Sequence, residues 1–188
     1  MPLTLEIPQS WDFKNETIIL PYEKNKEDLD TIQQYSGLKY QPVVNLNAKE
    51  TITFHHPEKP LKVFVLGLGE AKDQPKSYNY YRSIIHQLKA KCKLNAVVIG
   101  VHLNDIQLTN AVIGLRLSLY EIGIFKTNGN QLEEPQIKLF IDANQQKIAE
   151  NALQTAEAQL SAMYLVDMPS NHKTPEFLAN YAIESGQK

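Results

Sequence analysis

The hydrophobic pattern of the chain is organised around one strand and the helix that follows it. Residues 61–69 (LKVFVLGLG) are apolar on both faces of a strand and end in two glycines, Gly67 and Gly69. A short, β-branched run of this kind predicts a strand that is covered on both sides. Apolar residues recur at helical spacing in residues 78–91. The pattern therefore predicts a strand, a glycine turn and a helix, which together form one α/β unit.

Other segments extend this alternation. Further strands are predicted at residues 3–7, 17–20, 50–55, 95–101 and 137–141, and helices at residues 28–38, 108–120 and about 142–163. Because Pro8 and Pro21 interrupt the first two strands, both are expected near a sheet edge. The run at 95–101 is apolar on both faces, so we expect it beside 61–69, parallel to it and linked through the helix at 78–91. Residues 41–47 are ambiguous.

Strands that alternate with helices predict a three-layer α/β/α domain with a mostly mixed sheet over residues 1–164. The chain has 188 residues, which suggests one domain and a remainder, residues 165–188. Hydrophobic residues make up 43% and charged residues 21%, values typical of a globular protein with a full core. Gly114, in the middle of a helix with a very wide apolar surface, predicts close packing at that point.

The charge pattern bears on partners and location. Nineteen Lys and Arg against 21 Asp and Glu give a formal charge of -2 without a basic cluster, so nucleic acid is an unlikely partner. The sequence shows no secretion signal and no run long enough to span a membrane, so we expect a cytoplasmic protein. Cys92 is the sole cysteine, which excludes an internal disulfide. Its expected role is structural, with a reactive thiol as the alternative.

The two glycines after the central strand also allow a nucleotide-binding interpretation. Glycines let backbone N–H groups approach a phosphate at a helix N-terminus. Here Gly67-Leu68-Gly69 lacks a third glycine, and the negative charge of Glu70 follows at once. A tight turn that leaves a buried strand is the favoured interpretation.

Histidines offer little catalytic chemistry. His55 and His56 would point to opposite faces of a strand, which disfavours joint metal binding. His86 lies beside the apolar stripe of its helix and is interpreted as structural. His102 and Asp105 follow the carboxyl end of a strand, where α/β folds bind ligands, so they are kept as a candidate pair. Loop polarity and helix capping are the simpler explanation for these two. The sequence contains no nucleophile-elbow, zinc-protease or P-loop motif.

The last two dozen residues have a different character. Thr174 is a good N-cap, Pro175 suits the first helical position and Glu176 suits the positive end of a helix. The amphipathic helix that begins here would be marginal by itself, because isolated helices shorter than about 12–15 residues need something to pack against. This segment is therefore expected to be the opening element of a second domain.

Four stretches resemble the leucyl aminopeptidase, or cytosol aminopeptidase, family. They are residues 65–70 (VLGLGE), residues 114–120 (GLRLSLY) with Phe125-Lys126, the alanine-rich residues 149–163, and residues 165–171 (LVDMPSN) with 174–179 (TPEFLA). The last stretch is the most specific, although Asp167 and Met168 stand where the family commonly has an asparagine near the proline.

The resemblance implies a macro-domain-like N-terminal domain that is followed by a catalytic domain with two divalent metal ions, zinc or manganese. It also implies homohexamers and peptide substrates. The implied metal ligands cannot be placed in this sequence, so no catalytic, cofactor-binding or metal residue is assigned and the chain itself is expected to be inactive.

Two hypotheses of different classes remain. The leading one is a non-catalytic N-terminal domain of a cytosolic aminopeptidase, with a structural, assembly or regulatory role; the wide apolar surface of residues 108–120 would suit contact with the catalytic domain. The alternative is a stand-alone macro-like module that binds ADP-ribose or a related nucleotide near residues 67–70 and the loop after Val101. A DNA-binding regulatory role has little support in the near-neutral charge.

Overall fold

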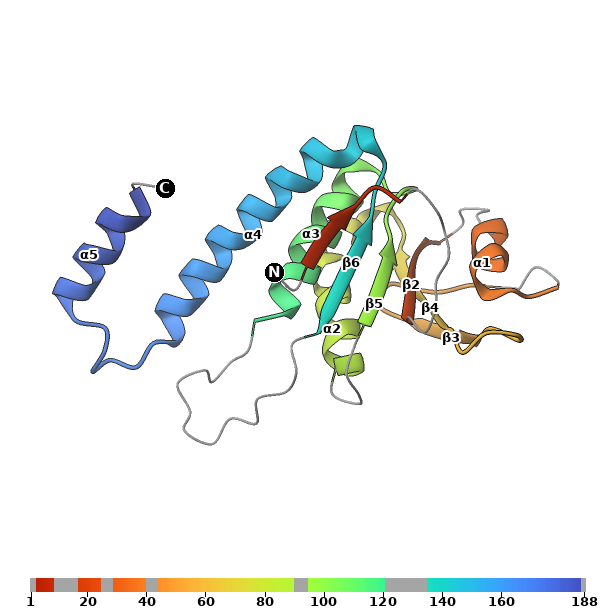
Figure 1. Ribbon diagram of the computed structural model, residues 1–188, viewed down its shortest axis with the longest axis horizontal. Helices are drawn as coiled ribbons and strands as arrows, with labels where there is room; N and C mark the ends of the chain where they lie inside the picture. The colour runs from red at the N-terminus through yellow and green to blue at the C-terminus, as the bar shows by residue number, and fades with distance from the viewer. Residues whose placement is uncertain are drawn as a thin grey trace.

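A computed structural model of the chain shows a six-stranded sheet with helices on both faces (Figure 1). The structure describes residues 3–8, 17–24, 29–39, 44–89, 95–120 and 135–186. The strands are β1 (Leu3–Glu6), β2 (Thr17–Glu23), β3 (Thr51–His55), β4 (Lys62–Gly69), β5 (Asn95–Ile99) and β6 (Gln136–Phe140). The helices are α1 (Leu29–Ser36), α2 (Tyr78–Lys89), α3 (Asp105–Ser118), α4 (Gln146–Asp167) and α5 (Pro175–Gly186), with short 3₁₀ helices η1 (Ala71–Lys76) and η2 (Ala143–Gln145).

The sheet is mixed, as predicted. Its order is β1-β6-β5-β2-β4-β3. All neighbouring strands are parallel except β3, which lies antiparallel to β4 at one edge. Right-handed crossovers through helices are the usual way to connect parallel strands, and this arrangement accounts for the helix that follows each interior strand.

The position of β2 corrects two predictions. Although β4 and β5 are parallel as expected, they are not neighbours, because β2 lies between them. The strand at residues 17–23 is therefore central, whereas Pro21 had suggested an edge. A proline fits there because the ladder to β5 ends with Ile19 opposite Val98. Proline has no N–H to donate, but at residue 21 the ladder to β5 has already ended, so no ladder bond to β5 is lost. The Pro21 carbonyl instead accepts a hydrogen bond from His102 Nε2 at 3.0 Å.

Two hydrophobic cores lie on opposite faces of the sheet and confirm the three layers. One contains strand residues such as Leu66 and Val98 packed against residues of α2, α3 and α4. The other contains alternate strand residues such as Val65 and Val97, packed with Ile32 of α1 and with Val44 and Leu46. Both sets are almost fully buried, as expected for interior strands that are apolar on both faces.

Helix α3 is packed between α2 and α4, which explains its wide apolar surface. The predicted close contact at Gly114 is confirmed. A Cβ there would collide with the Tyr78 carbonyl and lie 2.9 Å from Tyr81 Cβ. The apolar surface of residues 108–120 is thus used inside this domain, so it is not the surface for a catalytic domain that the leading hypothesis had suggested.

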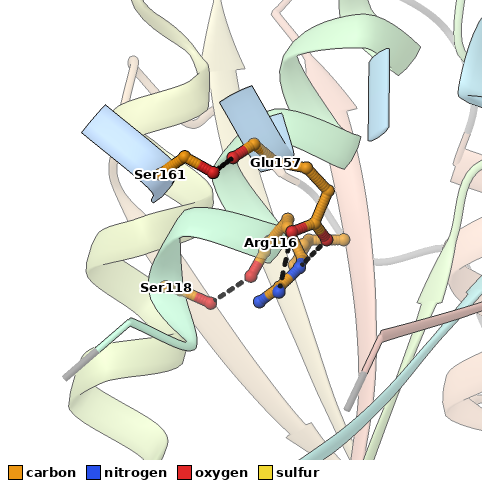
Figure 2. A network of polar contacts seen from close by, with 5 residues as sticks. Arg116, Ser118, Glu157 and Ser161 are labelled. Atoms are coloured by element: carbon orange, nitrogen blue, oxygen red, sulfur yellow. Dashed lines mark hydrogen bonds and ion pairs between the residues drawn. The ribbon is translucent and has the colours of Figure 1, made fainter. Parts of the chain in front are cut away.

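An ion pair joins α3 to α4 on the outside of this packing (Figure 2). Arg116 Nε donates to Glu157 Oε1 at 2.6 Å, and Arg116 Nη2 donates to Oε2 at 3.1 Å. Ala149, Ala152 and Ala156 of α4 are buried, α4 packs against α3, and Ala149 and Ala152 share a hydrophobic cluster with residues of α3. The predicted alanine-rich packing surface is therefore present.

Helix α5 differs from the other helices. It begins as predicted, with Thr174 Oγ1 accepting a hydrogen bond from the Phe177 N–H at 3.1 Å. It contains no buried residue, and Figure 1 shows it standing away from the sheet beyond the far end of α4. The apolar side chain of Ile183 is 60% exposed, and that of Val166 near the end of α4 is 75% exposed.

Candidate functional site

The sheet topology creates a crevice between the carboxyl ends of β2 and β5. After β2 the chain continues into α1 on one face, and after β5 it continues into α3 on the other face. Adjacent parallel strands whose connections leave in opposite directions form a topological switch point, where open α/β sheets bind ligands. A small pocket of about 20 Å³ lies at this point. Its lining consists of Leu20, Pro21, Tyr22, Glu23, Thr31, Ile32, Leu68, His102, Leu103 and Gln107.

Glu23, the last residue of β2, is the polar centre of this pocket. Gln107 Nε2 donates to Glu23 Oε2 at 2.7 Å, and Gln74 Nε2 donates to Oε1 at 3.2 Å. The two glutamines come from α3 and η1 and are 1% and 8% exposed. Two buried amides from different elements thus fix the position of one carboxylate.

Further hydrogen bonds fix the positions of Gln107 and Gln74. Asn104 caps α3, and the Gln107 side-chain oxygen accepts a hydrogen bond from the Asn104 N–H at 3.1 Å in a reciprocal capping box. Asn110 Nδ2 donates to the Gln74 carbonyl at 2.9 Å. This cluster was not predicted from the sequence. An N-x-x-Q capping box directly before an apolar run was the available signal for Gln107, whereas the contacts of Gln74 depend on tertiary structure.

The candidate pair His102 and Asp105 is not brought together. His102 Nε2 is bonded to the Pro21 carbonyl, which requires the hydrogen to be on Nε2. Its Nδ1 is buried and has no hydrogen-bond partner among the described residues. Asp105 is exposed in the first turn of α3, and the described interactions include no hydrogen bond or ion pair between the two side chains. Helix-end and loop roles therefore describe them better, with Asn104 as the cap.

The glycines after the central strand have separate roles. Gly69 has a φ of +75° and makes the predicted turn. Gly67 lies inside β4, where a Cβ would collide with the Asn47 carbonyl, so its role is close backbone approach rather than a turn. The Gly67 N–H donates to the Glu50 carbonyl at 2.9 Å, and the Glu70 N–H donates to Asp73 Oδ2 at 3.0 Å. Both N–H groups are thus already bonded and do not form a phosphate cradle.

The remaining histidines lie apart from the pocket. His56 Nδ1 accepts hydrogen bonds from the N–H groups of Glu58 and Lys59 at 3.1 and 3.2 Å, so it closes the proline-flanked turn between β3 and β4. His55 ends β3 and is exposed, and His86 is exposed on α2. Cys92 lies outside the described residues.

The described residues do not form a metal centre of the kind that the resemblance implies. Within the parts of the chain that the structure describes, no three His, Cys, Asp or Glu side chains are grouped so that they could hold a metal ion. The same parts contain no helix long and apolar enough to cross a membrane. The pocket is lined by the carboxylate of Glu23 and the imidazole of His102 between apolar side chains.

Sequence comparisons find neither a matching family model nor a matching curated protein. Structural comparisons do find matches. The bottromycin maturation enzyme BotP, whose structure was solved with Mn, aligns with a TM-score of 0.60 and 14% identity over 90% of this chain. The cytosol aminopeptidase of Coxiella burnetii aligns with a TM-score of 0.53 and 15% identity over 98% of this chain.

This chain spans only 36% of the length of BotP and 37% of the length of the Coxiella burnetii enzyme. At such low identity the likeness concerns the fold. The chain therefore has the α/β fold of the N-terminal portion of cytosol aminopeptidases.

Proposed function

We propose that this chain is a non-catalytic N-terminal domain of a metallo-aminopeptidase of the leucyl aminopeptidase type. The observation that carries the proposal is the shared six-stranded fold, which covers at least 90% of this chain and about a third of each solved enzyme. The junction residues 165–171 and 174–179, which resemble the same family in sequence, support it independently.

Helix α5 supports a division of the chain into residues 1–164 and a junction with the first helix of a following domain. An amphipathic helix of 12 residues that buries none of them is not stabilised by its own domain. In the proposed protein its exposed apolar side chains, such as Leu178 and Ile183, pack on the catalytic domain.

The chemistry would then reside outside this chain. In the proposed parent enzyme, two divalent metal ions, zinc or manganese, supply an activated water and stabilise the oxyanion during removal of the N-terminal residue from a peptide. The role of this domain is structural, or concerns assembly into a hexamer or regulation of access to the site. Its cellular location is the cytoplasm.

Two measurements test the proposal together. The purified chain should not hydrolyse leucine p-nitroanilide with Mn²⁺ or Zn²⁺ present, whereas the native protein captured from source cells with an antibody should do so. The intact subunit mass of that native protein should be well over twice 21.4 kDa. A native subunit of 21.4 kDa, or activity of the purified chain itself, would show that the proposal is wrong.

The alternative function is a macro-like module that binds ADP-ribose. Its support is the pocket, which lies beside the loop after Val101 where such binding was expected. Against it, Glu23 is acidic, no Lys or Arg is among the described residues that line the pocket, and the nearby N–H groups of Gly67 and Glu70 are already bonded. Calorimetry with ADP-ribose tests it, and we expect no heat of binding.

A further inference from the structure

We propose that the outer edge of β3 binds the same edge of a second copy of this chain, so that the two sheets join into one continuous sheet across a two-fold axis. The two β3 strands run antiparallel to each other in this pair. Figure 1 shows β3 at the end of the molecule opposite to α5, so this surface is separate from the proposed contact with a catalytic domain. The inference therefore goes beyond the proposed function and does not depend on it.

The first argument is the set of backbone groups that β3 leaves unused. On its β4 side, the His56 N–H donates to the Leu61 carbonyl at 3.0 Å. Because hydrogen-bonded residues alternate along an antiparallel pair, the backbone groups of Thr51, Thr53 and His55 point away from β4. Within the described parts of the chain, no hydrogen bond reaches the N–H or carbonyl groups of these three residues. They form a row of donors and acceptors that another strand can pair with.

The second argument is that this edge lacks the usual protection against pairing. The sequence of β3, Thr-Ile-Thr-Phe-His, contains no proline and no Lys, Arg, Asp or Glu. Edge strands normally carry such residues, because an unprotected edge joins other strands. The side chains of Thr51, Thr53 and His55 are exposed. A second β3 would therefore meet an open edge and would bring no two acids and no two lysines together.

The third argument is that the ends of β3 favour one antiparallel register. Pairing Thr53 with Thr53 of the second copy places Thr51 opposite His55 and uses all the outward-facing backbone groups. A shift of two residues in one direction would place Thr51 opposite Pro57, which has no N–H. The same shift in the other direction would place His55 opposite Lys49, whose φ of +73° lies outside the extended region. The pairing is therefore centred on Thr53 and is isologous.

The side chains also match in this register. On one face, Ile52 lies opposite Phe54 of the second copy, and both residues already pack against the hydrophobic cluster that contains Val65 and Ile32. Pairs of an aromatic and a β-branched residue stabilise neighbouring strands. On the other face, Thr53 meets its own copy, and threonine pairs across strands are also favourable. The edge is thus complementary to itself in backbone, apolar and polar groups.

The first test is the mass of the complete, purified chain at increasing concentration, measured by sedimentation equilibrium. The pairing strand has 5 residues in each copy, so the interface is small and association should be weak. We expect the mass to rise from 21.4 kDa toward twice that value between about 10 µM and about 1 mM. A chain that stays monomeric throughout this range would overturn the proposal.

The variant Thr53→Lys places two lysines against each other on the axis and should weaken association by about tenfold or more. Thr155→Lys is the matched control, because it makes the same change at an exposed residue of α4 and should leave association unchanged. If Thr53→Lys associates as strongly as the wild type, the copies meet through another surface and the proposal is wrong.

A second test reads the register directly and decides the matter if Thr53→Lys does not fold. Thr53→Cys is made in a Cys92→Ser background, so that each copy has one thiol. The Cα atoms of a hydrogen-bonded antiparallel pair are about 5.5 Å apart, within the range of a disulfide. With oxidised glutathione as the oxidant, we expect Thr53→Cys to form a disulfide-linked dimer much faster than Thr155→Cys in the same background. Equal rates would contradict pairing at Thr53.

Discussion

Arg116 on α3 and Glu157 on α4 form a two-point ion pair, with Nε to Oε1 at 2.6 Å and Nη2 to Oε2 at 3.1 Å. The arginine side chain is 18% exposed and the glutamate 44%. A planar guanidinium matches both oxygens of a carboxylate, whereas a lysine could meet them only as a point charge. The pair therefore adds a directional contact between two helices that otherwise meet through apolar side chains.

Replacing Arg116 by Lys should therefore weaken the domain although the charge is kept. We expect the free energy of unfolding to fall, because lysine cannot make the two parallel hydrogen bonds that arginine makes. The loss should be only about 1 kcal/mol, because the pair is partly exposed and is screened by solvent. Urea unfolding measures it, and a double-mutant cycle with Glu157→Gln isolates the pair. A coupling energy near zero would mean that the two side chains contribute independently.

Gly114→Ala should destabilise the domain in spite of the better helix propensity of alanine. The added Cβ collides with the Tyr78 carbonyl, which is backbone and cannot easily move. We expect a net loss of about 1–3 kcal/mol in the free energy of unfolding. Gly186→Ala in α5 is the control, since a Cβ there meets nothing within 4 Å. Similar, small effects of both substitutions in urea unfolding would contradict the predicted collision.

Tyr81→Phe should leave stability unchanged or raise it by about 1 kcal/mol. The Tyr81 hydroxyl is fully buried without a hydrogen-bond partner among the described residues, and this burial raises the pKa of its phenol. Tyr22→Phe is the matched control. Its hydroxyl donates to the Val44 carbonyl at 3.2 Å, so its removal should cost about 1 kcal/mol. Thermal unfolding of both variants compares them, and a clear loss with Tyr81→Phe would reveal a hidden partner.

The phenol of Tyr120 should ionise at a higher pH than an ordinary tyrosine. Desolvation, and next the hydrogen bond from its hydroxyl to Asp167 Oδ2 at 2.8 Å, raise the pKa of Tyr120 to about 12. Because the unfolded phenol ionises near pH 10, the stability that this group contributes is complete below about pH 10 and is lost as pH rises from about 10 to 12.

Asp167→Asn should lower the pKa of Tyr120, leaving it above the ordinary value because desolvation is the larger cause. The absorbance of ionised tyrosine against pH measures this shift, with Tyr120→Phe to identify the transition. Asp105→Asn, at the opposite end of α3, should not change the curve. An unchanged titration after Asp167→Asn would refute the role of the hydrogen bond.

Removing residues 171–188 should change the free energy of unfolding by less than about 0.5 kcal/mol, because α5 buries no residue. Hydrogen exchange of the complete chain provides a second measure. Amides of α5 should exchange far faster than those of α3, whose side chains are largely buried. The contrasting variant lacks residues 157–188. It loses Glu157 and the buried Leu160, so the domain should be destabilised. Strong protection of α5 would show that it has a partner within this chain.

Local patterns predicted most of the fold. Runs apolar on both faces gave the interior strands β4 and β5, and Gly37, with a φ of +66°, ends α1 as expected. Strand order was harder. The apolar residues of β2 carry no information on which strands flank it. Pro21 suggested an edge strand because a proline cannot donate to a ladder. A proline is nevertheless accommodated in this central strand, because the ladder to β5 ends before residue 21, and that end point cannot be predicted from the sequence.

The pocket was only partly predictable. The loop that contains His102 was expected near a ligand site from the general behaviour of parallel strands. Glu23 was not singled out, since its significance comes from Gln74 and Gln107, which are 51 and 84 residues away in the sequence. Side-chain clusters assembled across such distances leave no local periodicity to detect.

The pairing of β1 with β6 has a consequence for synthesis of the protein on the ribosome. Leu3 lies opposite Ile137 and Glu6 opposite Phe140, so among the described strands the one that comes first in the sequence pairs with the one that comes last. At a synthesis rate of about 5–20 residues per second, the interval between synthesis of β1 and synthesis of β6 is roughly 7–30 seconds. Throughout that time β1 exposes unpaired backbone groups, and the edge of β5 does so from its own synthesis until β6 is made; such edges are templates for wrong pairing. Nascent chains that are crowded on one messenger RNA would meet this hazard first, and binding by a chaperone would be most useful before residue 140 emerges.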